Sequence, residues 1–236
     1  MTVIYQNTST SFYICQHITN ADIFTCYNFS MYLSDPRRKS SNHTSFKFLI
    51  GIDEVGRGPI AGPVAVGAFI FLTPTAERLF DGVKESKQLS EKKREEWCEK
   101  ILEIKKAGHV DFSVSFQNEK VIDEQGISYA IRHCLENSIE NLNMEADECR
   151  VLLDGGLKAP LKYADQETII KGDAKESVIA LASICAKVER DRLMRKLALE
   201  YPEYGFDVHK GYGTARHYEA IARHGLCPIH RRTFIK

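Results

Sequence analysis

Short apolar runs that end in an acid are the most regular pattern along this chain. Uninterrupted apolar runs and period-two alternation predict strands at residues 48–52, 64–72, 109–116, 150–154 and 168–173. Three of these strands deliver a carboxylate at or just past the C-terminal end: Asp53, Asp154 and Asp173. Because ligands bind at the carboxyl edge of open α/β sheets, we expect the three acids to meet in one site.

Helical periodicity accounts for much of the remaining sequence. Ser90 is the predicted N-cap of a helix over residues 91–106. Further helices are predicted at residues 127–141, at residues 177–200 and in a short segment that ends near Gly225. The mixture of strands and helices predicts an α/β fold.

Charge and cysteine usage narrow the functional classes. The 236-residue chain carries 32 basic and 32 acidic residues, a balance that argues against an extended surface for nonspecific binding of nucleic acid. Residues 187–236 nevertheless contain 11 Lys and Arg against 6 Asp and Glu, so this region is the candidate surface for a phosphate backbone. Seven cysteines at irregular spacing fit neither a zinc site nor an even disulfide set, so we expect free thiols and a cytoplasmic location. No apolar run approaches ~20 residues, so no membrane span is predicted.

The N-terminal residues differ from the rest of the chain. Residues 1–46 are rich in Ser, Thr, Asn and scattered aromatics, and they lack the charged start and apolar core of a secretory signal. We interpret them as a poorly ordered extension, so that the folded domain covers residues 47–236.

The stretch from Ile52 to Gly58 contains the densest group of candidate functional residues. Its apolar strand ends in the adjacent acids Asp53 and Glu54, and Arg57 then stands between two glycines. Carboxylates at the end of a buried strand are costly to desolvate unless a cation holds them, and hard oxygen ligands favour Mg²⁺ or Mn²⁺. Because neighbouring residues of a strand point to opposite faces, the two acids share one site only if the backbone turns at Glu54. The alternative is that both acids are solvated turn residues that close the strand.

These residues resemble the hallmark of ribonuclease HII, in which a strand ends in Asp-Glu and Gly-Arg-Gly follows. Later stretches match that family in the same order over roughly residues 48–234. They are Glu85-Ser86-Lys87-Gln88-Leu89-Ser90, Leu153-Asp154-Gly155, Lys171-Gly172-Asp173-Ala174-Lys175, Ala182-Ser183-Ile184-Cys185-Ala186-Lys187-Val188-Glu189-Arg190-Asp191, His209-Lys210-Gly211-Tyr212-Gly213-Thr214 and His230-Arg231-Arg232-Thr233-Phe234. The resemblance implies a ribonuclease H-like catalytic domain, with a mixed sheet flanked by helices and a C-terminal helical region.

The resemblance also implies a reaction. The family's four metal ligands match Asp53, Glu54, Asp154 and Asp173, which would hold two divalent ions, Mg²⁺ or Mn²⁺. Four carboxylates balance the charge of two such cations. The implied substrates are RNA–DNA hybrids and duplex DNA with single embedded ribonucleotides, as in ribonucleotide excision repair, and the implied products end in a 5′-phosphate and a 3′-hydroxyl. For Asp154 and Asp173, the alternative is an ordinary Asp-Gly or Gly-Asp turn.

Substrate contacts are implied for seven further residues. A site for such substrates must sense one 2′-hydroxyl, which separates RNA from DNA. By resemblance, the sensors are backbone groups of Gly56, Arg57 and Gly58, together with Tyr212, whose counterpart packs on the deoxyribose that follows the ribonucleotide. Candidate phosphate contacts are Lys87, Lys175 and Lys187.

Plainer interpretations stay open for several of these residues. Tyr212 could be a core or loop aromatic, and the lysines could be ordinary solvated side chains. Weaker candidates for the site are His209, His230, Arg231 and Arg232, because histidine at a turn is more often structural than catalytic. We expect a monomer, since nothing in the sequence indicates further subunits.

Two other functions are considered. Ribonuclease HIII has Lys where this chain has Arg57 and usually carries a separate N-terminal substrate-binding domain. A catalytically silent hybrid-binding module would be expected to have lost at least one acid. The chain departs from the usual family pattern at Glu85, Gly156 and Leu181, but no departure removes a metal ligand.

Overall fold

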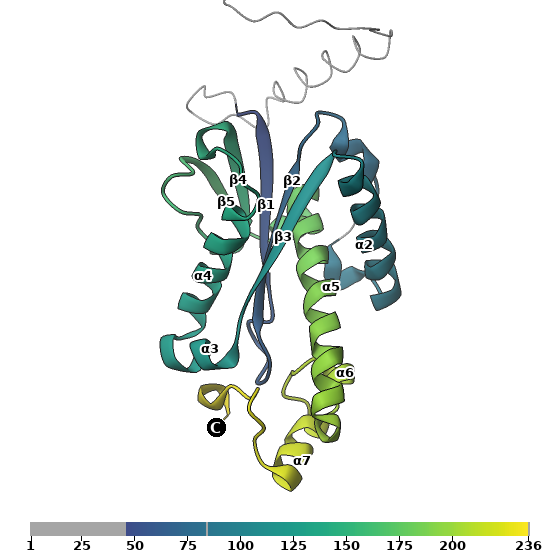
Figure 1. Ribbon diagram of the computed structural model, residues 1–236, viewed down its shortest axis with the longest axis vertical. Coiled ribbons are helices and arrows are strands. Elements are labelled where there is room, and N and C mark those ends of the chain that lie inside the picture. The colour runs from purple at the N-terminus through teal and green to yellow at the C-terminus, as the bar shows by residue number, and fades with distance from the viewer. Residues whose placement is uncertain (1–45, 84, 236) are drawn as a thin grey trace, which may run out of the picture. The chain divides into compact units, whose positions relative to one another are not determined.

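A five-stranded mixed sheet is the centre of the structure, a computed structural model that describes residues 46–83 and 85–235. The strands are β1 (Phe48–Val55), β2 (Val64–Phe71), β3 (Val110–Gln117), β4 (Cys149–Asp154) and β5 (Asp165–Ile169). They stand in the order β3-β2-β1-β4-β5 (Figure 1). β2 pairs antiparallel with both β1 and β3, whereas β4 pairs parallel with both β1 and β5.

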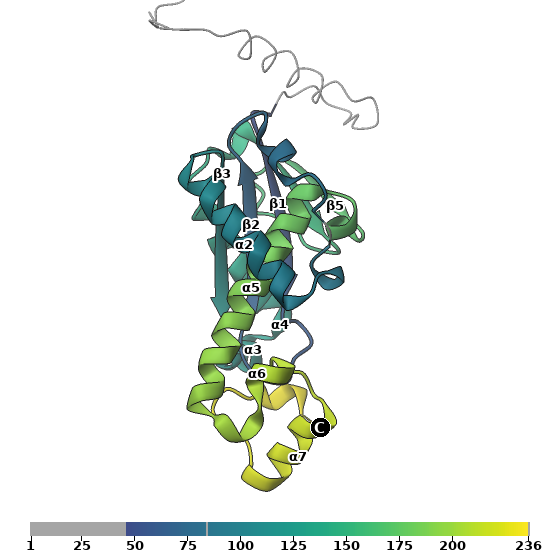
Figure 2. The same ribbon diagram turned by 90° about the vertical axis from the view of Figure 1, so that its right-hand side faces the viewer.

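Helices cover both faces of this sheet (Figure 1). On one face, Ile50 and Ile52 of β1 share an apolar core with Ile131 and Leu135 of α4 (Ile127–Glu140). The long helix α5 (Ser177–Glu200) packs on β1 and β2 from the other face, and α2 (Glu91–Lys106) packs beside it (Figure 2). The remaining helices are α3 (Glu119–Gln125), α6 (Phe206–His209) and α7 (Ala215–His224), with short 3-10 turns η2 (Ala76–Phe80), η3 (Ser86–Gln88), η4 (Ala146–Glu148), η5 (Gly172–Ala174), η6 (Pro202–Tyr204) and η7 (Arg232–Phe234).

Two glycines let α5 approach the sheet closely. A Cβ atom at Gly51 of β1 would stand 2.4 Å from the carbonyl oxygen of Val178, and one at Gly67 of β2 would stand 2.5 Å from that of Ala182. The apolar first half of α5 therefore rests directly on the strand backbones, which explains why that half is buried on nearly all sides.

The C-terminal region meets the end of the sheet where β1 finishes (Figures 1 and 2). The N–H of Ile60, in the turn after β1, donates a 2.9 Å hydrogen bond to the carbonyl of Gly211. Ala61 forms an isolated antiparallel bridge with His230. This region has its own apolar cluster, which includes Met194 and Phe206. The basic C-terminal quarter is thus joined to the Gly-Arg-Gly turn.

The α/β fold predicted from the sequence is confirmed, with local corrections. The last strand was predicted to run to Asp173, but β5 ends at Ile169 and Asp173 lies in η5. A single helix was predicted after Gly126, and the structure adds α3 before it. Gly126 has a φ of 86°, a conformation that separates the two helices and favours glycine.

Two further predictions concern membranes and the N-terminus. No helix within residues 46–83 and 85–235 combines the length and apolar character needed to span a lipid bilayer. The predicted extension over residues 1–46 lies, apart from Phe46, outside the described residues. Both its poor order and the domain boundary at residue 47 stay predictions.

Candidate active site

The register of two parallel strands brings Asp53 and Asp154 together. Ile52 of β1 is paired with Leu153 of β4, and each aspartate is the next residue of its strand. Both carboxylates therefore leave the sheet at the same carboxyl edge. Asp53 is buried, with 4% of its surface exposed, on the face of the sheet that α5 covers.

A tight turn, rather than a strand end, carries the third acid. After β5 ends, Lys171 adopts a left-handed conformation with φ of 55°, and η5 follows immediately. The N–H of Gly172 then donates a 2.6 Å hydrogen bond to Oδ1 of Asp154. A Cβ atom at Gly172 would stand 2.6 Å from Cδ1 of Ile179, so glycine is required for this approach. The buried Asp173 is thereby brought beside Asp154.

The electrostatics of Asp53 show that the acids share one environment. The pKa of Asp53 is raised to about 7, mainly by burial and also by the neighbouring carboxylates of Asp154, Glu54 and Asp173, whereas a hydrogen bond with Ser183 acts in the opposite direction. The site therefore has an excess of negative charge that a bound cation would neutralise.

Glu54 does not follow the expected geometry. β1 stays paired with β2 through Val55, so the predicted turn of the backbone at Glu54 is wrong. Its carboxylate accepts a 2.9 Å hydrogen bond from Nε of Arg57. Because neighbours in a strand point to opposite faces, Glu54 and Asp53 leave β1 in different directions. A place for Glu54 in a shared metal site stays a prediction.

The loop before α2 reaches the carboxylates through two side chains. The buried hydroxyls of Ser86 and Ser183 lie 2.8 Å apart, and Ser183 is the residue that bonds to Asp53. Nζ of Lys87 donates to Oδ2 of Asp173 at 3.3 Å. Arg94 of α2 fixes this loop by donating to the carbonyl oxygen of Ser86 at 3.1 Å. The Glu85-Ser86-Lys87 stretch thus lies at the site.

The predicted sensor residues also lie together. A Cβ atom at Gly58 would stand 3.8 Å from Cε1 of Tyr212, whose side chain is partly exposed. Gly211 makes this approach possible, because a Cβ there would stand 2.3 Å from the carbonyl oxygen of Ala61. The fully buried Arg231 donates to the carbonyls of Gly56 and Arg57 and so fixes the other side of the turn.

The two remaining lysines differ in their surroundings. Lys175 is exposed and lines, together with Asp173, a cavity of about 510 Å³ between η2 and the start of α5. Lys187 lies one helical turn after Ser183 on α5, and its ammonium donates to Oδ1 of Asp191 at 2.7 Å. Burial lowers the pKa of Lys187, and this ion pair opposes that shift. A role for either lysine in phosphate binding stays a prediction.

The chemistry of the donors fits a divalent metal ion, although the side chains are not assembled around one. In the described part of the chain, no group of three or more His, Cys, Asp or Glu side chains is arranged so that it could hold a metal ion. Asp173 is turned to Lys87 and Glu54 to Arg57. Carboxylate oxygens are the ligands that Mg²⁺ and Mn²⁺ prefer, and Asp53 is buried among three other acids. Binding a cation there would require Asp173 and Glu54 to release these partners.

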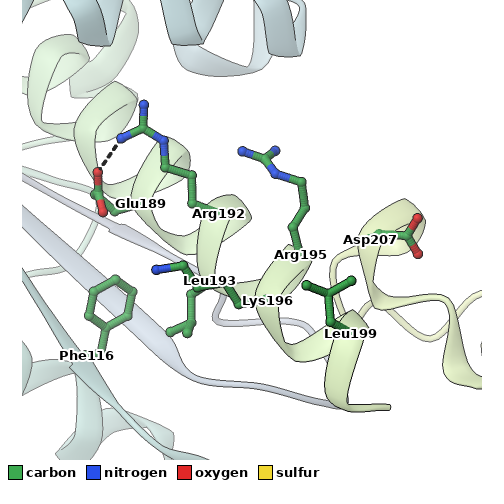
Figure 3. Close-up of a pocket in the computed structure, with 8 residues that line it drawn as sticks. All are labelled: Phe116, Glu189, Arg192, Leu193, Arg195, Lys196, Leu199 and Asp207. Carbon is green, nitrogen blue, oxygen red and sulfur yellow. Dashed lines mark hydrogen bonds and ion pairs between the residues drawn. The ribbon is translucent and has the colours of Figure 1, made fainter. Parts of the chain in front are cut away.

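A second cavity, of about 800 Å³, lies along the C-terminal half of α5. Figure 3 shows that it is lined by Phe116 of β3, Asp207 of α6 and, between them, residues of α5 that include Arg192 and Lys196. The guanidinium of Arg192 is already paired with Glu189 (Figure 3) and with Glu95 of α2. None of the residues predicted for the site lines this cavity.

Sequence reasoning gave no role to several residues that organise the site. Ser183 is a polar residue within an apolar stretch of α5, and this contrast was the available signal. Arg231 was only a weak candidate, and His217, which contacts the Tyr212 loop, was not considered. Arg231 bonds to backbone carbonyls of the Gly-Arg-Gly turn and His217 to the backbone carbonyl of Tyr212, and no residue type marks such contacts in a sequence.

Comparison with known proteins identifies what the chain is similar to. The family model described as Ribonuclease HII matches residues 50–236. The Ribonuclease HII of Caldicellulosiruptor bescii is 44% identical over 191 residues, covering 81% of this chain and 88% of that protein. The Ribonuclease HII of Endomicrobium trichonymphae is 45% identical over 184 residues, covering 78% of this chain and 83% of that protein.

A solved structure extends the comparison to the fold. The PCNA:RNase HII complex from Archaeoglobus fulgidus contains a chain that superposes with a TM-score of 0.65 at 26% sequence identity. The match covers 80% of this chain and 96% of that one. The sequence comparison and the structure comparison therefore both lead to ribonuclease HII proteins.

Proposed function

The chain belongs to the ribonuclease HII family, and we propose on this basis that it cuts duplex DNA at single embedded ribonucleotides as well as RNA–DNA hybrids. Membership makes it an endoribonuclease of the divalent-metal-dependent kind that acts on RNA–DNA hybrids, which excludes the silent binding module and favours ribonuclease HII over HIII. The observation that carries the proposal is the convergence of Asp53, Asp154 and Asp173 at one sheet edge.

The acidic cluster is the proposed reaction centre. Asp53, Asp154, Asp173 and Glu54 would hold two divalent ions, Mg²⁺ or Mn²⁺. The chemistry supplied to these carboxylates by bound ions would be a lowered pKa of an attacking water and stabilisation of the leaving 3′ oxygen. The resulting ends would be a 5′-phosphate and a 3′-hydroxyl.

The chain's own residues would place the substrate. The rigid β1–β4 pair fixes Asp53 and Asp154 relative to each other, and Ser183 orients Asp53. Lys87, which already donates to a carboxylate of the cluster, would turn to a phosphate oxygen when substrate is present. Lys175 and Lys187 are proposed as further phosphate contacts.

Discrimination between RNA and DNA is assigned to the Gly-Arg-Gly turn and Tyr212. Backbone groups of Gly56, Arg57 and Gly58 are the proposed sensors of the 2′-hydroxyl, and the ring of Tyr212, beside Gly58, would pack on the next deoxyribose. An exposed aromatic ring suits this role because it offers a flat apolar face at low entropic cost.

The test compares substrates and metals in one assay. The full chain is incubated with an all-DNA duplex, a duplex with one ribonucleotide and an RNA–DNA hybrid, each with Mg²⁺, with Mn²⁺ or with EDTA. We expect nicking of the last two substrates only, with metal only, and ligatable 5′-phosphate ends. Cleavage of the hybrid without cleavage at the single ribonucleotide would contradict the proposal.

A variant separates catalysis from binding. Asp154→Asn preserves the size of the side chain and its acceptor for the Gly172 N–H, but it removes a charge from the cluster. We expect cleavage to be abolished while duplex affinity, measured by fluorescence anisotropy, is largely kept. Monomeric state and cytoplasmic location stay predictions.

A further inference from the structure

Three buried histidines lie directly behind the loop that carries Tyr212. His217 and His230 are essentially inaccessible, and His209 is 9% exposed. The rings of His209 and His217 stack with centroids 4.4 Å apart and an interplanar angle of 17°. None of them touches the acidic cluster through a hydrogen bond described for residues 46–83 and 85–235, so the proposed chemistry gives them no role.

Hydrogen bonds link Tyr212, His217, His230 and Cys227 in a chain, here called the relay, in which each donor can be assigned. The carbonyl oxygen of Tyr212 lies 2.9 Å from Nδ1 of His217, so His217 must donate from Nδ1. Its Nε2 is then an acceptor, and it lies 3.0 Å from Nε2 of His230, which must donate. Nδ1 of His230 is then left as an acceptor; it lies 2.9 Å from the N–H nitrogen of Cys227, which donates to it, and 3.2 Å from the carbonyl oxygen of the same residue. Each neutral imidazole thus uses one donor and one acceptor.

His209 holds the other side of the same loop. Its Nε2 lies 2.7 Å from the carbonyl oxygen of Tyr204 and must donate, so its Nδ1 accepts the 3.2 Å hydrogen bond from the N–H of Gly211. The N–H of Tyr212 donates to the carbonyl of His209 at 2.9 Å. Of the two peptide groups that flank the Tyr212 Cα, one is therefore held by the main-chain carbonyl of His209 and the other by the imidazole of His217.

The loop needs such support because its backbone is strained. Lys210 adopts a left-handed conformation with φ of 52°, and Gly211 follows with φ of 88°. A lysine in this region is disfavoured and persists only where the surroundings hold it. Without the histidine contacts, the Tyr212 ring would lose its fixed position beside Gly58.

Burial keeps the relay neutral. It lowers the pKa of all three histidines, to about 4 for His217, although the hydrogen bonds that His209 and His217 donate to backbone carbonyls act in the opposite direction. A charged ring could not accept a hydrogen bond at its second nitrogen, so the direction of the relay depends on neutrality.

We propose that His217, supported by His230 and Cys227, is a positioning residue. It holds the Tyr212 ring where that ring can recognise the junction between a ribonucleotide and the following deoxyribonucleotide. This inference rests on the proposed role of Tyr212. The residue contacts no substrate itself. It acts through the Tyr212 carbonyl, which it shares with the N–H of Thr214 at 2.9 Å.

The test uses two isosteric variants of His217. In His217→Asn, the amide nitrogen takes the place of Nδ1 and can still donate to the Tyr212 carbonyl. In His217→Gln, the amide takes the place of Nε2 and that donor is lost. The measured quantity is the ratio of kcat/KM for a duplex with one ribonucleotide to kcat/KM for a duplex with a run of ribonucleotides.

We expect the Gln variant to lower this ratio about tenfold, as a small displacement of a contact residue does, and the Asn variant to retain it. Tyr212→Ala should lower the ratio as well, and adding His217→Gln to it should cause no further loss. Equal losses in the Asn and Gln variants would overturn the inference, because they would indicate a merely structural role. A loss with Tyr212→Ala but not with His217→Gln would overturn it while leaving the role of Tyr212 intact.

If Tyr212→Ala itself leaves the ratio unchanged, the proposed role of Tyr212 fails and this inference fails with it, whereas metal-dependent cleavage is untouched. A measurement on the unmodified protein is independent of folding defects. Nitrogen-15 NMR should find the Nδ1–H tautomer at His217 and the Nε2–H tautomer at His209 and His230. The Nε2–H tautomer at His217 would overturn the relay.

Discussion

Nη2 of Arg231 donates a 2.8 Å hydrogen bond to the carbonyl oxygen of Gly56, across 175 positions of the sequence. The same guanidinium, fully buried, donates to the carbonyls of Arg57 at 3.1 Å and Gly62 at 2.9 Å. One side chain therefore holds both ends of the turn that carries the predicted sensor residues. Burial, and the neighbouring charge of Arg190, lower the pKa of Arg231 to about 9, so it is charged and fully donating at neutral pH.

Arg231→Met should destabilise the protein and weaken cleavage together. The substitution keeps much of the apolar volume but removes the donor for three carbonyls, two of them in buried hydrogen bonds, which we expect to lower the free energy of unfolding by about 3 kcal/mol. Urea unfolding measures the loss. The adjacent Arg232→Met is the control: that side chain is exposed, so its effect should stay within about 0.5 kcal/mol. Equal effects of the two substitutions would contradict the assigned role.

Gly51→Ala should disrupt the contact between the sheet and α5. The new Cβ would stand 2.4 Å from backbone atoms of Val178, which cannot rotate away, so we expect a loss of about 3 kcal/mol or failure to fold. Gly156→Ala is the matched control, because no heavy atom lies within 4 Å of its added Cβ. The melting temperatures of both variants, compared with that of the parent, test this prediction. A Gly51→Ala protein as stable as the parent would mean that α5 does not pack directly on β1.

The sequence predicted the sheet and the acids well because both leave local signals. Strand 48–52 and the acids after it are visible as an apolar run followed by charge, and β1 and β4 indeed place Asp53 and Asp154 at one edge. The path of the chain to Asp173 was not visible, since it depends on a left-handed Lys171 and on a close approach at Gly172. Backbone conformations of this kind are set by tertiary contacts.

The turn expected at Glu54 shows the limit of a purely local argument. The requirement that both acids share a site was physically sound, but the pairing of β1 with β2 continues to Val55 and keeps the strand straight. Arg231 and His217 escaped prediction for a related reason. Their partners are carbonyl oxygens, which every residue has, so no residue type marks the contact.

The buried histidines should each contribute a loss of stability in mild acid. The pKa of His217 is lowered from 6.5 to about 4 by burial, so between these values the unfolded chain binds a proton that the folded protein does not. The contribution of His217 to the free energy of unfolding is therefore complete above about pH 6.5 and decreases toward pH 4, by about 3 kcal/mol. The lowered pKa values of His209 and His230 act in the same direction.

His217→Asn isolates that contribution, because its side chain does not titrate. Urea midpoints of parent and variant, measured between about pH 7 and pH 4, should converge as the pH falls. Asp53, whose pKa is raised to about 7, stabilises the folded state as pH falls, but it does so in both proteins and cancels in the difference. Parallel pH profiles would show that His217 is not kept neutral by the fold.

Lys87 should matter for cleavage and little for stability. Its side chain is 74% exposed and pairs with the buried Asp173 at 3.3 Å; because water solvates the lysine end of this pair, we expect it to contribute no more than about 1 kcal/mol. A cation that reaches the acidic cluster from solvent is, however, placed to meet a phosphate oxygen. We therefore expect Lys87→Ala to lower kcat/KM on the single-ribonucleotide duplex about 100-fold, as the loss of one transition-state donor does.

The control is Lys120→Ala, which removes an equally exposed lysine, 75% accessible and 4.0 Å from Glu124. It should leave both kcat/KM and the free energy of unfolding unchanged. If the two variants behave alike, the ion pair between Lys87 and Asp173 is only a surface contact, and the phosphate must be held by other residues.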